Sequence, residues 1–193
     1  MTALASANAT PEIAKPDASP TEAPETASEP TRDSSQDFLL RVVLEGEPLT
    51  LRQTPLLEAD RAQAVADLQH ENSFAPIGLP NTSTGPFILH LSIQQGRLVF
   101  DVRDREDAPL SILALALGPF RGLIKDYQLL VDSHAKAVEE GREARIQAID
   151  MGRRGLHNEG ADLMMLRLGR KVEIDHETAR RLFTLLCVLH QRI

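Results

Sequence analysis

The chain has 193 residues, of which 42% are hydrophobic, and its 28 acidic residues outnumber 21 Lys and Arg to give a formal net charge of −7. This acidic balance, together with an aromatic content of only 4%, argues against nucleic-acid binding, and the single cysteine, Cys187, excludes a disulfide within the chain. No stretch approaches the roughly eighteen apolar residues of a membrane span, and the first residues, MTALASANAT, lack a basic and apolar leader, so we expect a cytoplasmic protein without a membrane segment.

The N-terminal segment differs in composition from the rest of the chain. Residues 1–36 consist largely of Ala, Pro, Ser, Thr and Glu and contain almost no large apolar side chain. Such a segment cannot bury enough apolar surface to offset the entropy lost on ordering. The sequence therefore predicts a disordered tail over residues 1–36 and a single domain over residues 37–193.

A strand and a helix are the first elements expected after the tail. The run FLLRVVL, residues 38–44, is apolar and rich in β-branched residues and stops before Gly46, which is typical of a buried strand. Apolar residues at helical spacing then predict a helix over residues 55–71, with Thr54 as its N-cap and Pro55 in its first turn.

The next segment reads as a loop followed by three strands. Residues 72–86 are rich in Pro, Gly, Asn, Ser and Thr, which indicates a long loop that Phe74 and Ile77 can attach to the core. Residues 86–117 contain three apolar runs separated by QQG and RDREDAP. This pattern predicts an antiparallel meander.

Helices are expected throughout the C-terminal part. A wide apolar stripe predicts one helix over residues 118–141, and residues 142–168 look helical again. Asp175 is a suitable N-cap for a last helix, in which Leu186 and Leu189 should be buried. Strands that precede helices along the chain indicate an α+β fold. We therefore expect a mainly antiparallel sheet of about four strands with the helices packed on one face.

Residues 151–161, MGRRGLHNEGA, combine two arginines, a histidine and three glycines within the predicted helix. Three helical glycines cost about 2.5 to 3 kcal/mol relative to alanines, so something should compensate. Either Gly152 and Gly160 let a neighbouring element approach closely, or the helix breaks at Gly155. We favour a continuous helix with both glycines on its packed face.

On a continuous helix Asp150, Arg154 and His157 share the opposite face. Asp150 and Arg154 can form an exposed ion pair, or the arginines and His157 can converge on a phosphate or carboxylate. Glu159 can act as an acid or base beside His157 only if the helix breaks. The candidate ligand-binding or partner-binding residues are Asp150, Arg153, Arg154, His157, Asn158 and Glu159.

Other chemistry is not indicated by the sequence. It contains no P-loop, no GxGxxG motif after a strand and no CxxC pair, and its histidines do not follow metal-ligand spacing. We therefore expect neither a cofactor nor a metal, and catalytic residues remain unassigned.

Four stretches of the sequence carry a resemblance to a known family. IQAIDMGRRGLHNEG, DHETARRLFTLLCVLH, LHLSIQQGRLVFDVRD and LGPFRGLIKDY resemble a bacterial uncharacterised protein family, the one numbered two hundred and sixty-two. The similarity spans about residues 38–193. It implies a small cytoplasmic bacterial protein with no established activity, so it transfers no catalytic residue.

Two hypotheses of function follow. The first is a non-enzymatic regulatory or interaction module that presents the 150–161 face to a protein partner or to a second copy in a homo-oligomer. The alternative is an enzyme or sensor that binds a small anionic metabolite through a phosphate or carboxylate group. A concave pocket around these residues favours the second hypothesis, whereas a flat exposed ridge favours the first.

Overall fold

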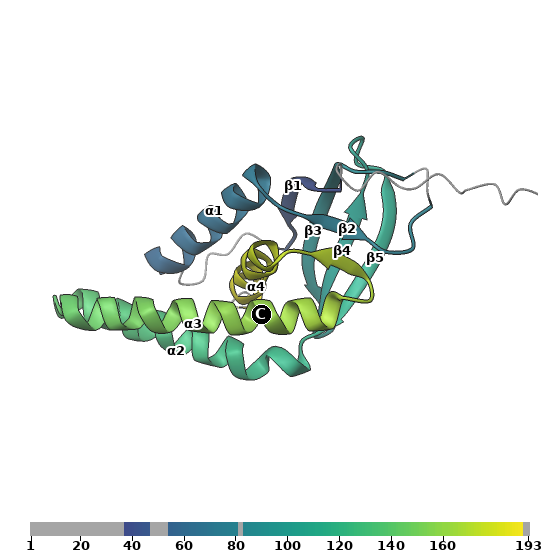
Figure 1. The fold of residues 1–193 in the computed structure, drawn as a ribbon. Helices are drawn as coiled ribbons and strands as arrows, with labels where there is room; N and C mark the ends of the chain where they lie inside the picture. The colour runs from purple at the N-terminus through teal and green to yellow at the C-terminus, as the bar shows by residue number, and fades with distance from the viewer. Residues whose placement is uncertain (1–36, 47–53, 81–82, 191–193) are drawn as a thin grey trace, which may run out of the picture.

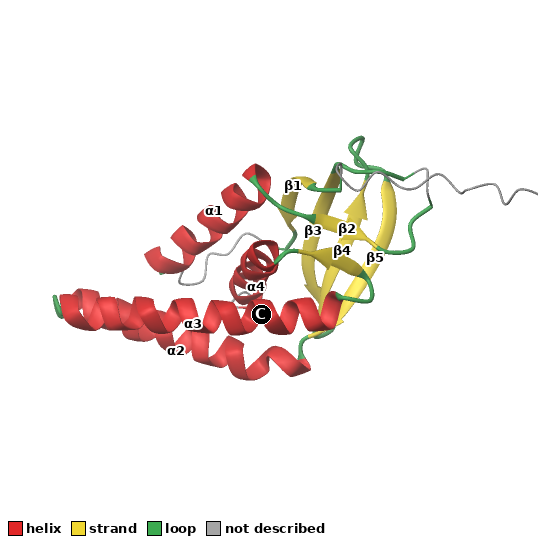
Figure 2. Cartoon of the chain, in the orientation of Figure 1, coloured by secondary structure: helices red, strands yellow, loops and turns green. Residues whose placement is uncertain are grey.

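A computed structural model describes residues 37–46, 54–80 and 83–190. The tail predicted for residues 1–36 lies outside these ranges. The elements in chain order are β1 (Leu39–Leu44), α1 (Pro55–His70), β2 (Phe74–Pro76), β3 (Phe87–Gln94), β4 (Arg97–Arg103), β5 (Pro109–Ala116), a short 3-10 helix (Gly118–Phe120), α2 (Arg121–Glu139), α3 (Glu143–Leu168), β6 (Val172–Ile174) and α4 (His176–His190). The helices pack on one side of the main sheet, as predicted (Figures 1 and 2).

The main sheet has the strand order β1-β3-β4-β5 and is mostly antiparallel. β3, β4 and β5 form the predicted meander, and Gln94 pairs with Arg97 across a tight turn in which Gln95 and Gly96 both have positive φ. Two consecutive residues in this conformation match the right-handed twist of a hairpin. β1 is parallel to β3, because α1 carries the chain back across the sheet between them.

Two short strands were not predicted. β2 and β6 pair antiparallel, with Phe74 opposite Ile174 and Pro76 opposite Val172. Three residues are too few to show a period of two, so the sequence pattern of β2 resembled a loop. Phe74 is fully buried, as expected, but the side chain of Ile77 is 47% exposed and does not enter the core.

The two predicted N-caps, Thr54 and Asp175, are confirmed by their hydrogen bonds. The Thr54 hydroxyl accepts a hydrogen bond from the Leu57 amide at 3.3 Å, and the Asp175 carboxylate accepts one from the Thr178 amide at 2.6 Å. Each bond satisfies one amide that has no partner within its own helix.

α4 lies at the centre of the helical layer. It packs between α1 and α3, while α2 runs along α3 (Figure 1). Every side chain from Leu182 to Leu189 is buried, including the predicted core residues Leu186 and Leu189. Among the described residues, no helix is long and apolar enough to cross a membrane.

Candidate anion-binding cleft

α3 runs without a break through residues 151–161, so the favoured continuous helix is confirmed. Gly160 lies directly against Phe183 of α4, and a Cβ atom at this position would overlap the aromatic ring. Gly152 is exposed, and a Cβ atom there would meet only Leu130 at an ordinary 3.8 Å. The close approach predicted for both glycines is therefore present only at Gly160.

The predicted division of α3 into two faces is wrong for several residues. His157 was placed on the face opposite the packed glycines but is buried, whereas Gly152 was placed on the packed face but is exposed. The reason is that α2 and α4 both pack against α3 and cover a wide arc of its surface. Helical spacing gives the relative directions of side chains, but it does not say where the neighbouring helices lie.

The ion pair expected between Asp150 and Arg154 does not form. Asp150 instead contacts Arg153, the residue that precedes Arg154, at 3.3 Å. Arg153 also donates a hydrogen bond to Asp60 of α1. Burial alone would lower the pKa of the Arg153 guanidinium, but the hydrogen bond and the negative charge of Asp60 raise it. Arg153 therefore attaches α3 to α1.

Asp60 connects three helices through its two carboxylate oxygens. One oxygen accepts the hydrogen bond from Arg153 of α3, and the other accepts from the Tyr127 hydroxyl of α2 at 2.7 Å. Burial and the adjacent Asp60 carboxylate raise the pKa of Tyr127 above its ordinary value, so the phenol stays protonated.

His157 lies against two aromatic rings. It stacks on Tyr127 at 5.6 Å between ring centroids and meets Phe183 edge-on at 6.1 Å. Burial, with a smaller contribution from the positive charges of Arg153 and Arg180, lowers the pKa of His157 to about 4, although the Asp60 carboxylate acts in the opposite direction. The imidazole is therefore neutral near pH 7.

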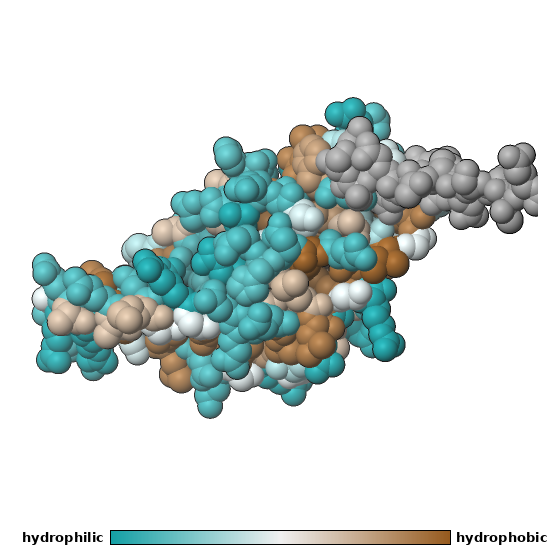
Figure 3. Space-filling model, viewed as in Figure 1, coloured by the Kyte–Doolittle hydropathy of each residue, from teal (hydrophilic) through white to brown (hydrophobic). Residues whose placement is uncertain are grey.

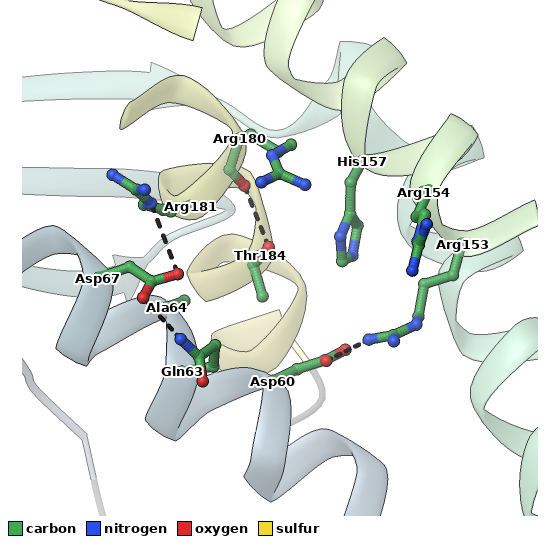
Figure 4. Close-up of a pocket in the computed structure, with 10 residues that line it drawn as sticks. All are labelled: Asp60, Gln63, Ala64, Asp67, Arg153, Arg154, His157, Arg180, Arg181 and Thr184. Atoms are coloured by element: carbon green, nitrogen blue, oxygen red, sulfur yellow. Dashed lines mark hydrogen bonds and ion pairs between the residues drawn. The ribbon is translucent and has the colours of Figure 1, made fainter. Parts of the chain in front are cut away.

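A cleft opens between α1, α3 and α4 beside His157 (Figure 4). Its volume is about 220 Å³, and on the face seen in Figure 3 the surface over these helices is mostly hydrophilic. The residues that line the cleft are Asp60, Gln63, Ala64, Asp67, Arg153, Arg154, His157, Arg180, Arg181 and Thr184. Four arginines against two aspartates give this lining an excess of positive charge.

Three buried nitrogen atoms at this cleft have no hydrogen-bond partner within the described part of the chain. They are Nε of Arg153, Nε2 of His157 and Nε of Arg181. The Arg181 Nε lies 3.7 Å from Asp67, too far for a hydrogen bond. Buried polar atoms are normally paired, so three unpaired nitrogens at one cleft mark it as a candidate binding site.

The remaining arginines differ in how they are neutralised. Arg180 forms an ion pair with Glu177 of the same helix at 2.6 Å. The exposed Arg154 has no acidic partner among residues 37–46, 54–80 and 83–190. Its guanidinium is therefore available to a negatively charged group.

The structure brings only part of the sequence-predicted site together. Arg153, Arg154 and His157 line the cleft, and Asp150 supports it through Arg153. Asn158 and Glu159 are exposed and are not among the lining residues. Because α3 is unbroken, His157 and Glu159 point in different directions and the acid-base pair considered for a broken helix does not form.

The sequence interpretation missed the contributions of α1 and α4. Asp60 lies 93 positions before Arg153, a separation that no local period can bridge. A second arginine pair, Arg180 and Arg181, was visible as a counterpart of Arg153 and Arg154. The chain's only tyrosine, at position 127, was a further signal, because a buried phenol needs a polar partner.

Metal binding and thiol chemistry are the two other kinds of site that side chains of this type can form. No group of three or more His, Cys, Asp or Glu side chains in that part of the chain is arranged to hold a metal ion. The Cys187 thiol is fully buried, and burial raises its pKa well above the ordinary value. Cys187 therefore serves as a packing residue of α4.

These features define a class of protein in which three helices beside a mostly antiparallel sheet form an arginine-lined cleft. The chain belongs to the uncharacterised protein family UPF0262, whose family model matches residues 36–192. The resemblance drawn from the sequence motifs is thereby confirmed.

Relatives with high identity come from several bacteria. The UPF0262 protein of Granulibacter bethesdensis is 68% identical over 160 residues, which cover 80% of this chain and 90% of the relative. The relative from Acidiphilium cryptum is 62% identical, with 80% and 93% of the two chains covered, and that from Rhodospirillum rubrum is 48% identical, with 81% and 94% covered. No solved structure matches the chain at a significant level.

Proposed function

We propose that this protein is a regulatory binding module whose cleft between α1, α3 and α4 holds a small anionic metabolite by a phosphate or carboxylate group. The observation that carries the proposal is the set of unpaired buried nitrogens of Arg153, His157 and Arg181 at one cleft. Leaving such an atom without a partner costs about 1 to 3 kcal/mol. An oxyanion accepts short, charge-assisted hydrogen bonds from the two arginine Nε–H groups, and from the imidazole in its Nε2–H tautomer.

The charge and size of the cleft support a small ligand. Arg154 presents an unneutralised guanidinium that can bind a carboxylate or phosphate through two parallel hydrogen bonds. The volume of about 220 Å³ lies below the range of about 300 to 1,000 Å³ that drug-sized molecules occupy. A compact metabolite suits this space better than a nucleotide or a peptide.

Inorganic phosphate is a suitable first probe. We expect it to raise the Tm of the wild-type protein relative to chloride at the same ionic strength, because a ligand that binds only the folded state stabilises it. Arg154→Ala should lose most of this increase. Arg145→Ala removes an exposed arginine of the same helix outside the cleft and should keep it. An equal response of both variants, or no response of the wild type, would contradict the proposal.

A partner-binding surface is a second candidate, and it has its own supporting observation. Met151 and Leu166 are 74% and 76% exposed, although both lie on α3. Large exposed apolar side chains are frequent at sites of protein association. If this outer side of α3 joins two copies of the chain, sedimentation should detect a dimer that Met151→Ser dissociates. A wild-type monomer at all concentrations would exclude this homo-oligomer.

A further inference from the structure

We infer that the ligand of this cleft carries hydroxyl groups in addition to its oxyanion, an inference that rests on the proposed function. It assigns the ligand to the phosphorylated or carboxylated small polyols. The carrying observation is the different chemistry of the two sides of the cleft. Donors gather on α3 and at the two arginines of α4, whereas acceptors gather on α1 and at Thr184 (Figure 4).

The acceptor side has unused hydrogen-bonding capacity. The Gln63 amide nitrogen donates to one oxygen of Asp67 at 2.6 Å, and no described residue donates to the Gln63 amide oxygen. The second Asp67 oxygen lies 3.7 Å from Arg181, too far for a hydrogen bond. The Thr184 hydroxyl donates to the Arg180 carbonyl at 3.0 Å, which leaves its oxygen free to accept.

A ligand that offers only acceptor atoms would satisfy the donors of α3 and α4 and leave these oxygens unused. Hydroxyl groups supply the missing donors. Ammonium groups suit the site less well, because each carboxylate already has a cationic neighbour: Asp60 is paired with Arg153 and Asp67 with Arg181. The acceptor side therefore offers hydrogen-bond acceptors without unneutralised negative charge, which favours a neutral donor.

Two matched pairs of small molecules test this inference by isothermal titration calorimetry. Glycerol 3-phosphate is compared with propyl phosphate, and glycerate with propionate, so that each pair differs only in its hydroxyl groups. In whichever pair binds, we expect the hydroxylated member to bind at least about tenfold more tightly, because its hydroxyl groups donate to cleft acceptors that its partner leaves without a donor. The two pairs also distinguish a phosphate from a carboxylate ligand.

Substitutions on α1 locate the hydroxyl contacts. Gln63→Leu should weaken the preference for the hydroxylated member, because it removes one of the three acceptors and leaves Asp67 and Thr184 in place. Gln69→Leu changes an exposed glutamine of the same helix outside the cleft and should keep the preference.

The possible outcomes separate this inference from the proposed function. Equal affinities within each binding pair would overturn the hydroxyl contacts and leave oxyanion binding intact. A preference of unchanged size in Gln63→Leu would overturn the contact between the hydroxyl groups and Gln63. Failure of all four compounds to bind would overturn the proposed function and this inference with it.

Discussion

Gly160 shows how a single residue brings α3 close to α4. Its missing side chain makes room for the ring of Phe183, which in turn meets the edge of His157. Phe183 is fully buried and also contacts Phe120, so the ring cannot easily move aside. The glycine thus contributes to the position of the cleft histidine, although it does not line the cleft itself.

Gly160→Ala should lower the free energy of unfolding by about 1 to 3 kcal/mol, because the added methyl group overlaps the Phe183 ring. This loss outweighs the gain of up to about 1 kcal/mol that alanine brings to a helix. Gly152→Ala is the matched control, and with only ordinary contact nearby it should be neutral or stabilising. Urea denaturation of both variants checks the prediction, which fails if Gly160→Ala is the more stable of the two.

His157 gives a second prediction at the residue scale, which concerns pH. Its pKa of about 4 in the folded protein lies below the value of about 6.5 for a free histidine. Between these values the unfolded chain binds more protons than the folded one, so stability is complete above about pH 6.5 and decreases as the pH falls toward 4. At about pH 4 the free energy of unfolding should be lower by about 3 kcal/mol from this effect.

Denaturation at a series of pH values measures this contribution by comparison with His157→Phe. The variant keeps an aromatic ring between Tyr127 and Phe183 but has no proton to bind, so its stability should decrease less between pH 6.5 and 4. His70→Phe makes the same change at an exposed site and should follow the wild type. Identical pH profiles for all three proteins would show that burial of His157 is not the cause.

Among the elements, α4 has the most clearly predicted role. Its middle section is apolar on every side, which indicated a helix surrounded by protein, and the structure places it between α1 and α3. α3 is a contrasting case. Its continuity was predictable because only Gly155 suggested a break, but its buried face was not, since that face depends on the positions of α2 and α4.

Leu186→Ala should cost about 2 to 5 kcal/mol, because it removes a fully buried side chain and leaves a cavity in the centre of the helical layer. Leu166→Ala makes the same change at a site on α3 that is 76% exposed, and it should alter stability by less than about 0.5 kcal/mol. Chemical denaturation distinguishes the two. Similar small effects at both positions would mean that α4 is not the packing centre.

On the scale of the whole molecule, Asp60 is the point where α1, α2 and α3 are joined. Asp60→Ala leaves the Arg153 guanidinium and the Tyr127 hydroxyl without their shared acceptor. We expect the free energy of unfolding to fall by about 2 to 3 kcal/mol. The loss is no larger because the Arg153 side chain is 22% exposed and keeps a contact with Asp150.

A double substitution tests whether this loss arises from the unpaired charge. Asp60→Ala combined with Arg153→Met removes both charges, so its cost should be smaller than the sum of the two single costs. Asp132→Ala, at an exposed site on α2, should have almost no effect. Costs that simply add would show that Asp60 and Arg153 act independently.

The sequence by itself determined the α+β class, the helix caps, the meander and the apolar character of α4, because caps, turns and periodic apolar residues act over a few positions. Only the tertiary structure decided that β1 lies parallel to β3, that His157 is buried and that Arg153 pairs with Asp60. These features depend on segments that are far apart in the chain, and their contacts follow from how the helices pack together, which no local pattern specifies. The cleft belongs to this second group, since three separate helices supply its walls.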